Sequence, residues 1–172
     1  MNEWAAPPSA DDDAWRAGVV NDFAKSELFD RTFKEGMALV EETAAYLDGP
    51  GRQDSKQLER KSALAYASES MRLTTRLMQV ASWLLVQRAV REGEMEPMAA
   101  CDARYRLSPE AAAPQGEPAA LPITLGDLLG RSERLYERVT HLDRRMYLDV
   151  TEAEQPHPVL SQLQKLQAAF GG

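Results

Sequence analysis

The stretch from Asp54 to Glu94 constrains the fold most, because it contains no proline or glycine before Gly93 and consists mostly of strong helix formers. It predicts one helix of roughly 40 residues, about 60 Å long. Asp54 or Ser55 can cap its start, and Gly93 can close its end. Helices in globular domains are usually much shorter. We therefore expect this helix to be the central element of the fold.

Two apolar stripes run along this predicted helix. The first has the rhythm of a face turned to a core and comprises Leu64, Ala67, Met71, Thr74, Met78, Ala81 and Leu85. The second is widened by Trp83 and Val86 and comprises Leu73, Leu77, Val80 and Leu84. A helix that is apolar nearly all round must be covered on more than one side. We predict that the second stripe is a homodimer interface, although the chain's own N-terminal arm or linker would cover it equally well.

The composition limits the classes of partner. A chain of 172 residues with 44% hydrophobic content can bury one real core. Its net charge of −7 and isoelectric point near 4.9 argue against nonspecific binding to nucleic acid or anionic lipid, so proteins are the expected partners.

The sequence also bears on the compartment. Its single cysteine, Cys101, excludes an intramolecular disulfide, and the N-terminus lacks the pattern of a signal peptide. The longest uncharged apolar run, 77–87, is about half of what a bilayer span needs, so we expect a cytoplasmic protein without a transmembrane helix.

The fold class expected is all-α, with an antiparallel three-helix bundle around the long central helix over residues 26–150, after a flexible acidic arm at 1–25. Its first helix starts after the Ser26 cap and ends near Asp48. The stripe of that helix comprises Phe29, Phe33, Gly36, Met37, Val40, Ala44 and Leu47. The short link at 49–53 makes the next helix antiparallel to it.

The remainder of the chain alternates between helix and loop. Pro97 starts a short helix that reaches about Arg104, and 106–123 is a proline-rich linker. The third helix runs from a Thr124 cap to Val150. Its stripe comprises Leu125, Leu128, Leu129, Ser132, Leu135, Tyr136, Val139, Leu142, Met146 and Val150. Residues 151–172 form a flexible tail, in which we predict that Leu163, Leu166 and Phe170 contact a protease or its cargo, against an idle or back-packed tail.

The sequence gives little support for a catalytic site or a metal site. His141 and His157 lack the spacing of metal-binding motifs, and Cys101 has no marked base. Gly126 to Gly130 lacks the spacing and the lysine of a phosphate loop. We predict no enzyme activity, no cofactor and no metal.

Three segments resemble the bacterial family of the regulator of CtrA degradation, RcdA. They are EGMALVEETAAYLDGPGR at 35–52, SALAYASESMRLTTRLMQVASWLLVQRAVREGEM at 62–95 and RSERLYERVTHLD at 131–143. The resemblance implies a three-helix-bundle homodimer that acts as an adaptor for the ClpXP protease in cell-cycle control, at a cell pole. Its implied partners are substrates such as CtrA, a CpdR-like response regulator and a cyclic-di-GMP effector protein. The alternative is a non-catalytic polar scaffold or localisation protein that does not deliver substrates.

Overall fold

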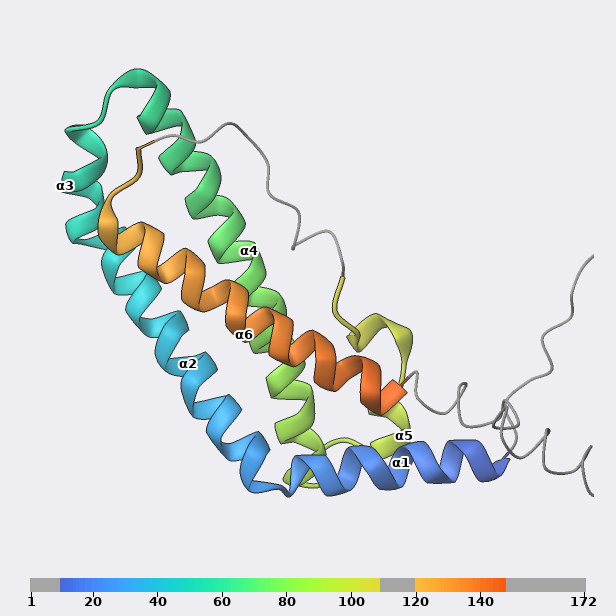
Figure 1. Ribbon diagram of the computed structural model, residues 1–172. Helices are drawn as coiled ribbons and strands as arrows, with labels where there is room; N and C mark the ends of the chain where they lie inside the picture. Colours follow the sequence, from blue (N-terminus) through green and yellow to red (C-terminus); the bar gives the residue numbers. More distant parts are fainter. Residues whose placement is uncertain (1–9, 109–119, 148–172) are drawn as a thin grey trace, which may run out of the picture.

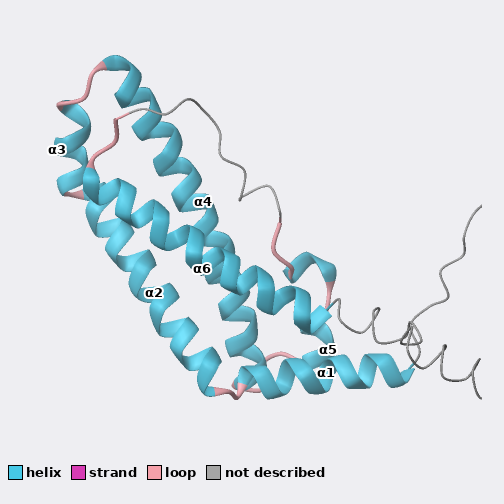
Figure 2. Cartoon of the chain, in the orientation of Figure 1, coloured by secondary structure: helices cyan, strands magenta, loops and turns pink. Residues whose placement is uncertain are grey.

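The computed structural model describes residues 10–108 and 120–147. In these ranges every secondary-structure element is a helix, which confirms the predicted all-α class (Figures 1 and 2). The elements are α1 (Ala10–Ala24), α2 (Glu27–Asp48), α3 (Pro50–Lys56), α4 (Arg60–Arg91), α5 (Pro97–Ala100), the 3-10 helix η1 (Ala103–Tyr105) and α6 (Ile123–Tyr147).

Helices α2, α4 and α6 form the bundle (Figure 1). Helices α2 and α4 are antiparallel. Phe33 of α2 lies beside Arg88 of α4, and Asp30, one turn earlier in α2, pairs with Arg91, one turn later in α4. Helix α6 instead runs parallel to α4, because an earlier residue of α4 contacts an earlier residue of α6 and a later one contacts a later one. Arg76 donates to Ser132 at 2.8 Å, and Trp83 donates to Asp143 at 3.0 Å.

The start of α2 follows the sequence prediction, and α4 packs closely against this helix. Ser26 caps α2 by accepting a hydrogen bond from the Phe29 backbone N–H at 3.1 Å. A Cβ on Gly36 would lie 2.6 Å from the Leu84 side chain, so this glycine lets the two helices pack closely. The buried stripe lies one position from the predicted one at several points and comprises Phe29, Thr32, Gly36, Leu39, Thr43 and Tyr46.

The predicted 40-residue helix is divided in two, and its predicted start is wrong. Pro50 at the first helical position begins the separate helix α3, whereas α4 begins only at Arg60. Asp54 is not a cap here, because its carboxylate accepts a hydrogen bond from the Tyr46 hydroxyl at 2.9 Å. Burial and this bond raise the pKa of Tyr46. The contact between Tyr46 and Asp54 holds α3 against the end of α2.

The predicted end of the long helix is correct. Gly93 has a φ of +75°, the left-handed conformation that glycine adopts at low cost. Its N–H donates to Val90, and the Glu94 N–H donates to Ala89 at 2.8 Å. These two bonds form a Schellman motif, which satisfies carbonyls in the last turn of α4.

The prediction of a flexible arm over residues 1–25 is wrong for the part that the structure describes. Residues 10–24 form α1, which lies across the end of the bundle beside α4 and α5 (Figure 1). Val20 and Ala24 are buried, and the Phe23 ring lies 5.6 Å from the Trp83 ring. Asp11, Asp12 and Asp13 occupy its first turn, where their charge complements the helix dipole. Helix α1 therefore covers a part of α4.

Helix α6 presents the predicted stripe to the core. Leu125, Leu128, Leu135 and Val139 are fully buried there. Arg76, 1% exposed, lies between α4 and α6, where it bonds Ser132 and pairs with Glu133 at 3.5 Å. Burial lowers the pKa of Arg76, and the nearby Glu133 charge opposes that shift. These polar contacts fix the position of α6 along α4.

Candidate interaction surfaces

The two stripes of α4 have the opposite roles to those predicted. Leu73, Leu77, Val80 and Leu84 are at most 3% exposed, and they pack in the core of the single chain. Their assignment to a dimer face is therefore corrected. The physical reason is that α2, α6 and α1 together cover this side of α4.

The other stripe faces solvent. Leu64, Met71, Met78 and Leu85 are 65%, 73%, 60% and 50% exposed. They follow one another at intervals of seven residues, and smaller residues stand between them at positions 67, 74 and 81. This is the spacing at which one helix packs along another. We call these four residues the α4 outer face; they form a continuous apolar row that nothing in the described chain covers.

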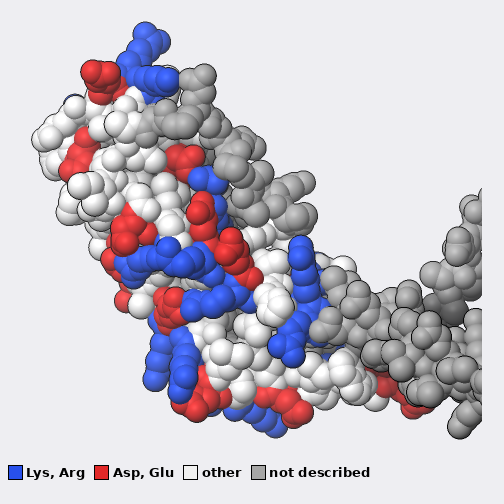
Figure 3. Space-filling view, viewed as in Figure 1, with Lys and Arg blue, Asp and Glu red and all other residues white. Residues whose placement is uncertain are grey.

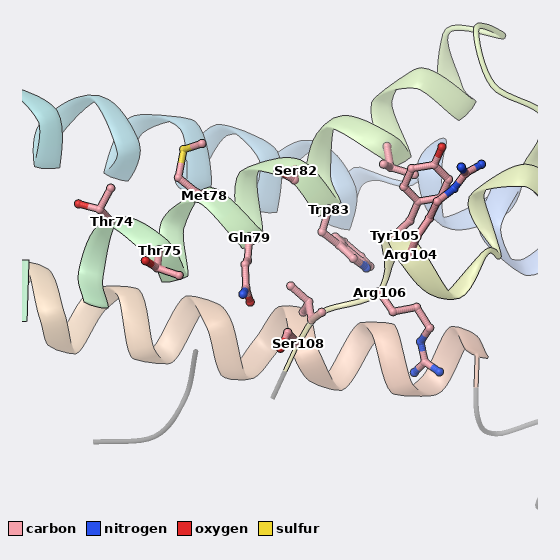
Figure 4. A pocket seen from close by; sticks show the side chains of 12 residues that line it. Thr74, Thr75, Met78, Gln79, Ser82, Trp83, Arg104, Tyr105, Arg106 and Ser108 are labelled. Atoms are coloured by element: carbon pink, nitrogen blue, oxygen red, sulfur yellow. The ribbon is translucent and has the colours of Figure 1, made fainter. Parts of the chain in front are cut away.

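A groove lies beside this face, between α4 and the segment 104–108 (Figure 4). It encloses about 490 Å³. Its wall is held in place by Asp143, which accepts from the Trp83 indole and from Arg106 at 3.1 Å. Its lining is more apolar than polar, and the buried side-chain oxygen of Gln79 has no hydrogen-bond partner among the described residues. We call this the α4 groove; it suits a ligand that carries hydrogen-bond donors.

A second groove of about 520 Å³ lies between α2 and α6. We call it the α2/α6 groove; its lining includes Leu28, Arg31, Thr32, Arg138, His141 and Leu142. Glu35 pairs with Arg138 at its edge, and Glu42 pairs with Arg131 at 2.7 Å two turns away. Charges of both signs gather over α2 and α6 on this face (Figure 3). The Arg131 guanidinium lowers the pKa of Glu42 by hydrogen bonding.

The residues considered for chemistry lie in ordinary surroundings. The Cys101 thiol donates to the Pro97 carbonyl at 3.4 Å, and burial raises its pKa, which disfavours the reactive thiolate. His141 is exposed on α6. In the described ranges, no three His, Cys, Asp or Glu side chains are grouped to hold a metal ion. No helix in the same ranges is long and apolar enough to cross a membrane.

Several predicted features lie outside the described residues. These are the tail residues Leu163, Leu166 and Phe170, His157, Val150 and most of the proline-rich linker. The short helix predicted from Pro97 is present as α5 followed by η1. Sequence reasoning missed α1, although the three aspartates ahead of Trp15, Val19 and Phe23 are a helix-start signal followed by helical apolar spacing.

Comparison with known proteins gives a matching family model and a matching solved structure. The family model DUF1465, described as a protein of unknown function, matches residues 20–170. The crystal structure of RcdA from Caulobacter crescentus CB15 is 71% identical in sequence, with a TM-score of 0.62. The match covers 74% of this chain and 98% of that chain. No curated protein matches the sequence.

Proposed function

We propose that this chain, which belongs to the RcdA family, is a non-catalytic adaptor that tethers substrates such as the transcription regulator CtrA to the ClpXP protease and promotes their degradation. The observation that carries the proposal is the 71% identity to RcdA, over nearly the whole of that chain. The other proposed partners are a CpdR-like response regulator and a cyclic-di-GMP effector protein, at a cell pole.

The surfaces of the chain support a role in binding proteins. A tether accelerates a reaction by raising the effective concentration of its cargo, and this requires surfaces rather than catalytic groups. The α4 outer face is an exposed apolar row, and large exposed apolar patches mark interaction sites. The tail residues Leu163, Leu166 and Phe170 are proposed to contact protease or cargo, because apolar residues at helical spacing can bind in a partner's groove.

The chain is proposed to form a homodimer through the α4 outer face. A two-fold axis uses the same patch twice, so a row of apolar residues can pack against its own copy. Met71 and Met78, at the middle of the row, are its most suitable centre, because flexible Met side chains adapt to a facing surface. The seven-residue spacing favours a second helix as the facing element.

The dimer is tested by the solution mass of the full chain, measured by light scattering over a wide concentration range. A mass of about twice 19.1 kDa is expected for the native chain. Met78→Asp should give the monomer mass with a native circular dichroism spectrum, because the dimer would bury a carboxylate. Ile123→Asp is the matched control, since Ile123 is 93% exposed but lies on α6. A Met78→Asp chain that stays dimeric would contradict the interface.

The adaptor role is tested by reconstituted degradation. Purified ClpXP, the response regulator and the cyclic-di-GMP effector are combined with CtrA, with and without this chain. The chain should increase the rate of CtrA loss, and a chain ending at Pro158 should lose most of that increase while keeping its fold. If the complete mixture degrades CtrA equally with and without the chain, the scaffold alternative replaces the adaptor.

A further inference from the structure

The α2/α6 groove has an apolar floor that a neutral segment can fill. Leu28 is a large side chain that remains 51% exposed in the first turn of α2. Thr32 is only 7% exposed, and its hydroxyl donates to the Leu28 carbonyl at 2.8 Å, so its hydrogen-bonding need is met inside the helix. Leu142 completes this floor from α6. Filling the groove would remove the apolar surface of Leu28 and Leu142 from water, and the Thr32 hydroxyl would keep its hydrogen bond.

The rim of the groove carries charges that already have partners. Arg138 pairs with Glu35, and Arg31 pairs with Glu27. Among the charged residues that line the groove, Arg31 and Arg138 balance Glu35 and Glu137, so the groove offers no strong attraction to an acidic or basic ligand. An occupant with apolar side chains and little charge fits this surface best.

The C-terminal segment of this same chain has that composition. Residues 159–170 contain one charged residue, Lys165, and several glutamines. Their apolar residues recur at helical spacing and comprise Val159, Leu160, Leu163, Leu166 and Phe170.

The point where α6 ends puts this segment within reach. Tyr147 is the last residue of α6, and Leu142 lies five residues earlier, about 8 Å along the helix. The 11 residues from Leu148 to Pro158 would span about 18 Å as a flexible chain. This tether is longer than the distance to the groove, and a short tether that reaches its site gives an effective concentration in the millimolar range, so a weak contact is enough.

We infer that residues 159–170 bind in the α2/α6 groove of their own chain, with Leu163, Leu166 and Phe170 on Leu28, Thr32 and Leu142. This inference does not depend on the adaptor role. In this arrangement the tail is a ligand of its own bundle. Any other partner that binds the tail then has to displace it from the α2/α6 groove. Its test needs the chain alone, so the outcome of a degradation assay leaves it unaffected.

The test is paramagnetic relaxation enhancement in the full-length chain. A nitroxide is placed by Gln164→Cys in a Cys101→Ser background, and backbone amide signals are recorded at a concentration where the chain is monomeric. Broadening is expected at residues 28–32 and 138–142. Broadening centred on the α4 groove or the α4 outer face would overturn the inference, as would the absence of any broadening in the bundle. A sample that mixes spin-labelled with isotope-labelled chains must show none, since broadening there would mean binding between chains.

Two matched substitutions test whether the tail binds in the α2/α6 groove. Leu28→Asp places a carboxylate on the floor of the groove at a half-exposed position, where the fold tolerates it. It should lower the ratio of bound to free tail by about tenfold. Leu64→Asp makes the same change at a 65% exposed position on α4 and should leave the broadening unchanged. Equal effects of the two substitutions, or no effect of Leu28→Asp, would refute the docking.

Discussion

Leu77 and Met78 are neighbours in sequence but point about 100° apart around α4, one into the core and one to solvent, so this pair tests which stripe is the core. Leu77 is 3% exposed and Met78 is 60% exposed. Replacing a buried leucine by alanine removes its transfer free energy and leaves a cavity, so Leu77→Ala should lower the free energy of unfolding by about 3 to 5 kcal/mol. Met78→Ala removes a side chain that is mostly in water and should change it by less than about 0.5 kcal/mol.

The assay is urea and thermal unfolding followed by circular dichroism. One kcal/mol corresponds to roughly 4 °C in Tm for a domain of this size, so Leu77→Ala should lower Tm by roughly 12 to 20 °C. Because Met78 lies on the proposed dimer face, both variants are compared at a concentration where light scattering gives the monomer mass. The reasoning is refuted if Met78→Ala then lowers Tm as much as Leu77→Ala, or if Leu77→Ala is neutral.

Two polar contacts give further predictions. Asp143→Ala removes the acceptor of the Trp83 indole and of Arg106 from a site that is 3% exposed, and it should cost about 3 to 5 kcal/mol in urea unfolding. Asp143→Asn keeps an oxygen for the indole and should cost less; equal costs would contradict the role of this bond. Arg131→Gln should cost at most about 1 kcal/mol at pH 7, because its pair with Glu42 is half exposed. Since Arg131 lowers the pKa of Glu42 below 4.5, that stabilisation is present above pH 4.5 and is lost as the pH falls through the lowered pKa; a difference that grows in acid would contradict it.

The interaction surfaces were predictable only in part. The sequence predicted that α4 carries two apolar stripes, and the structure contains both. The α2/α6 groove left no signal in the sequence, because it joins Leu28 to Leu142 across more than a hundred residues. The α4 groove likewise depends on the Asp143 contact with Arg106, which joins α6 to the segment after η1. Neither groove follows from spacing within one helix.

Local physical chemistry was enough for the features that one segment decides by itself. The Ser26 cap, the Pro97 start and the Gly93 end each satisfy backbone groups a few residues away, so their residue types mark these boundaries directly. The stripe of α6 is similarly clear, because its polar and apolar residues separate cleanly around the helix. The family also follows from the sequence, since long stretches of it match RcdA.

Only the tertiary structure decided which side of α4 is covered. An apolar stripe indicates that a surface is buried in the folded protein, but it does not identify the element that covers it. Helices α2 and α6 pack on the side of Leu77, and α1 adds Phe23 beside Trp83 at its end. That choice depends on how side chains from distant segments fill one space together, as Gly36 against Leu84 illustrates. The sequence determined the bounds of α2, the end of α4 and the presence of two apolar stripes on α4. Long-range packing determined that one stripe lies in the chain's own core and that the other stays open.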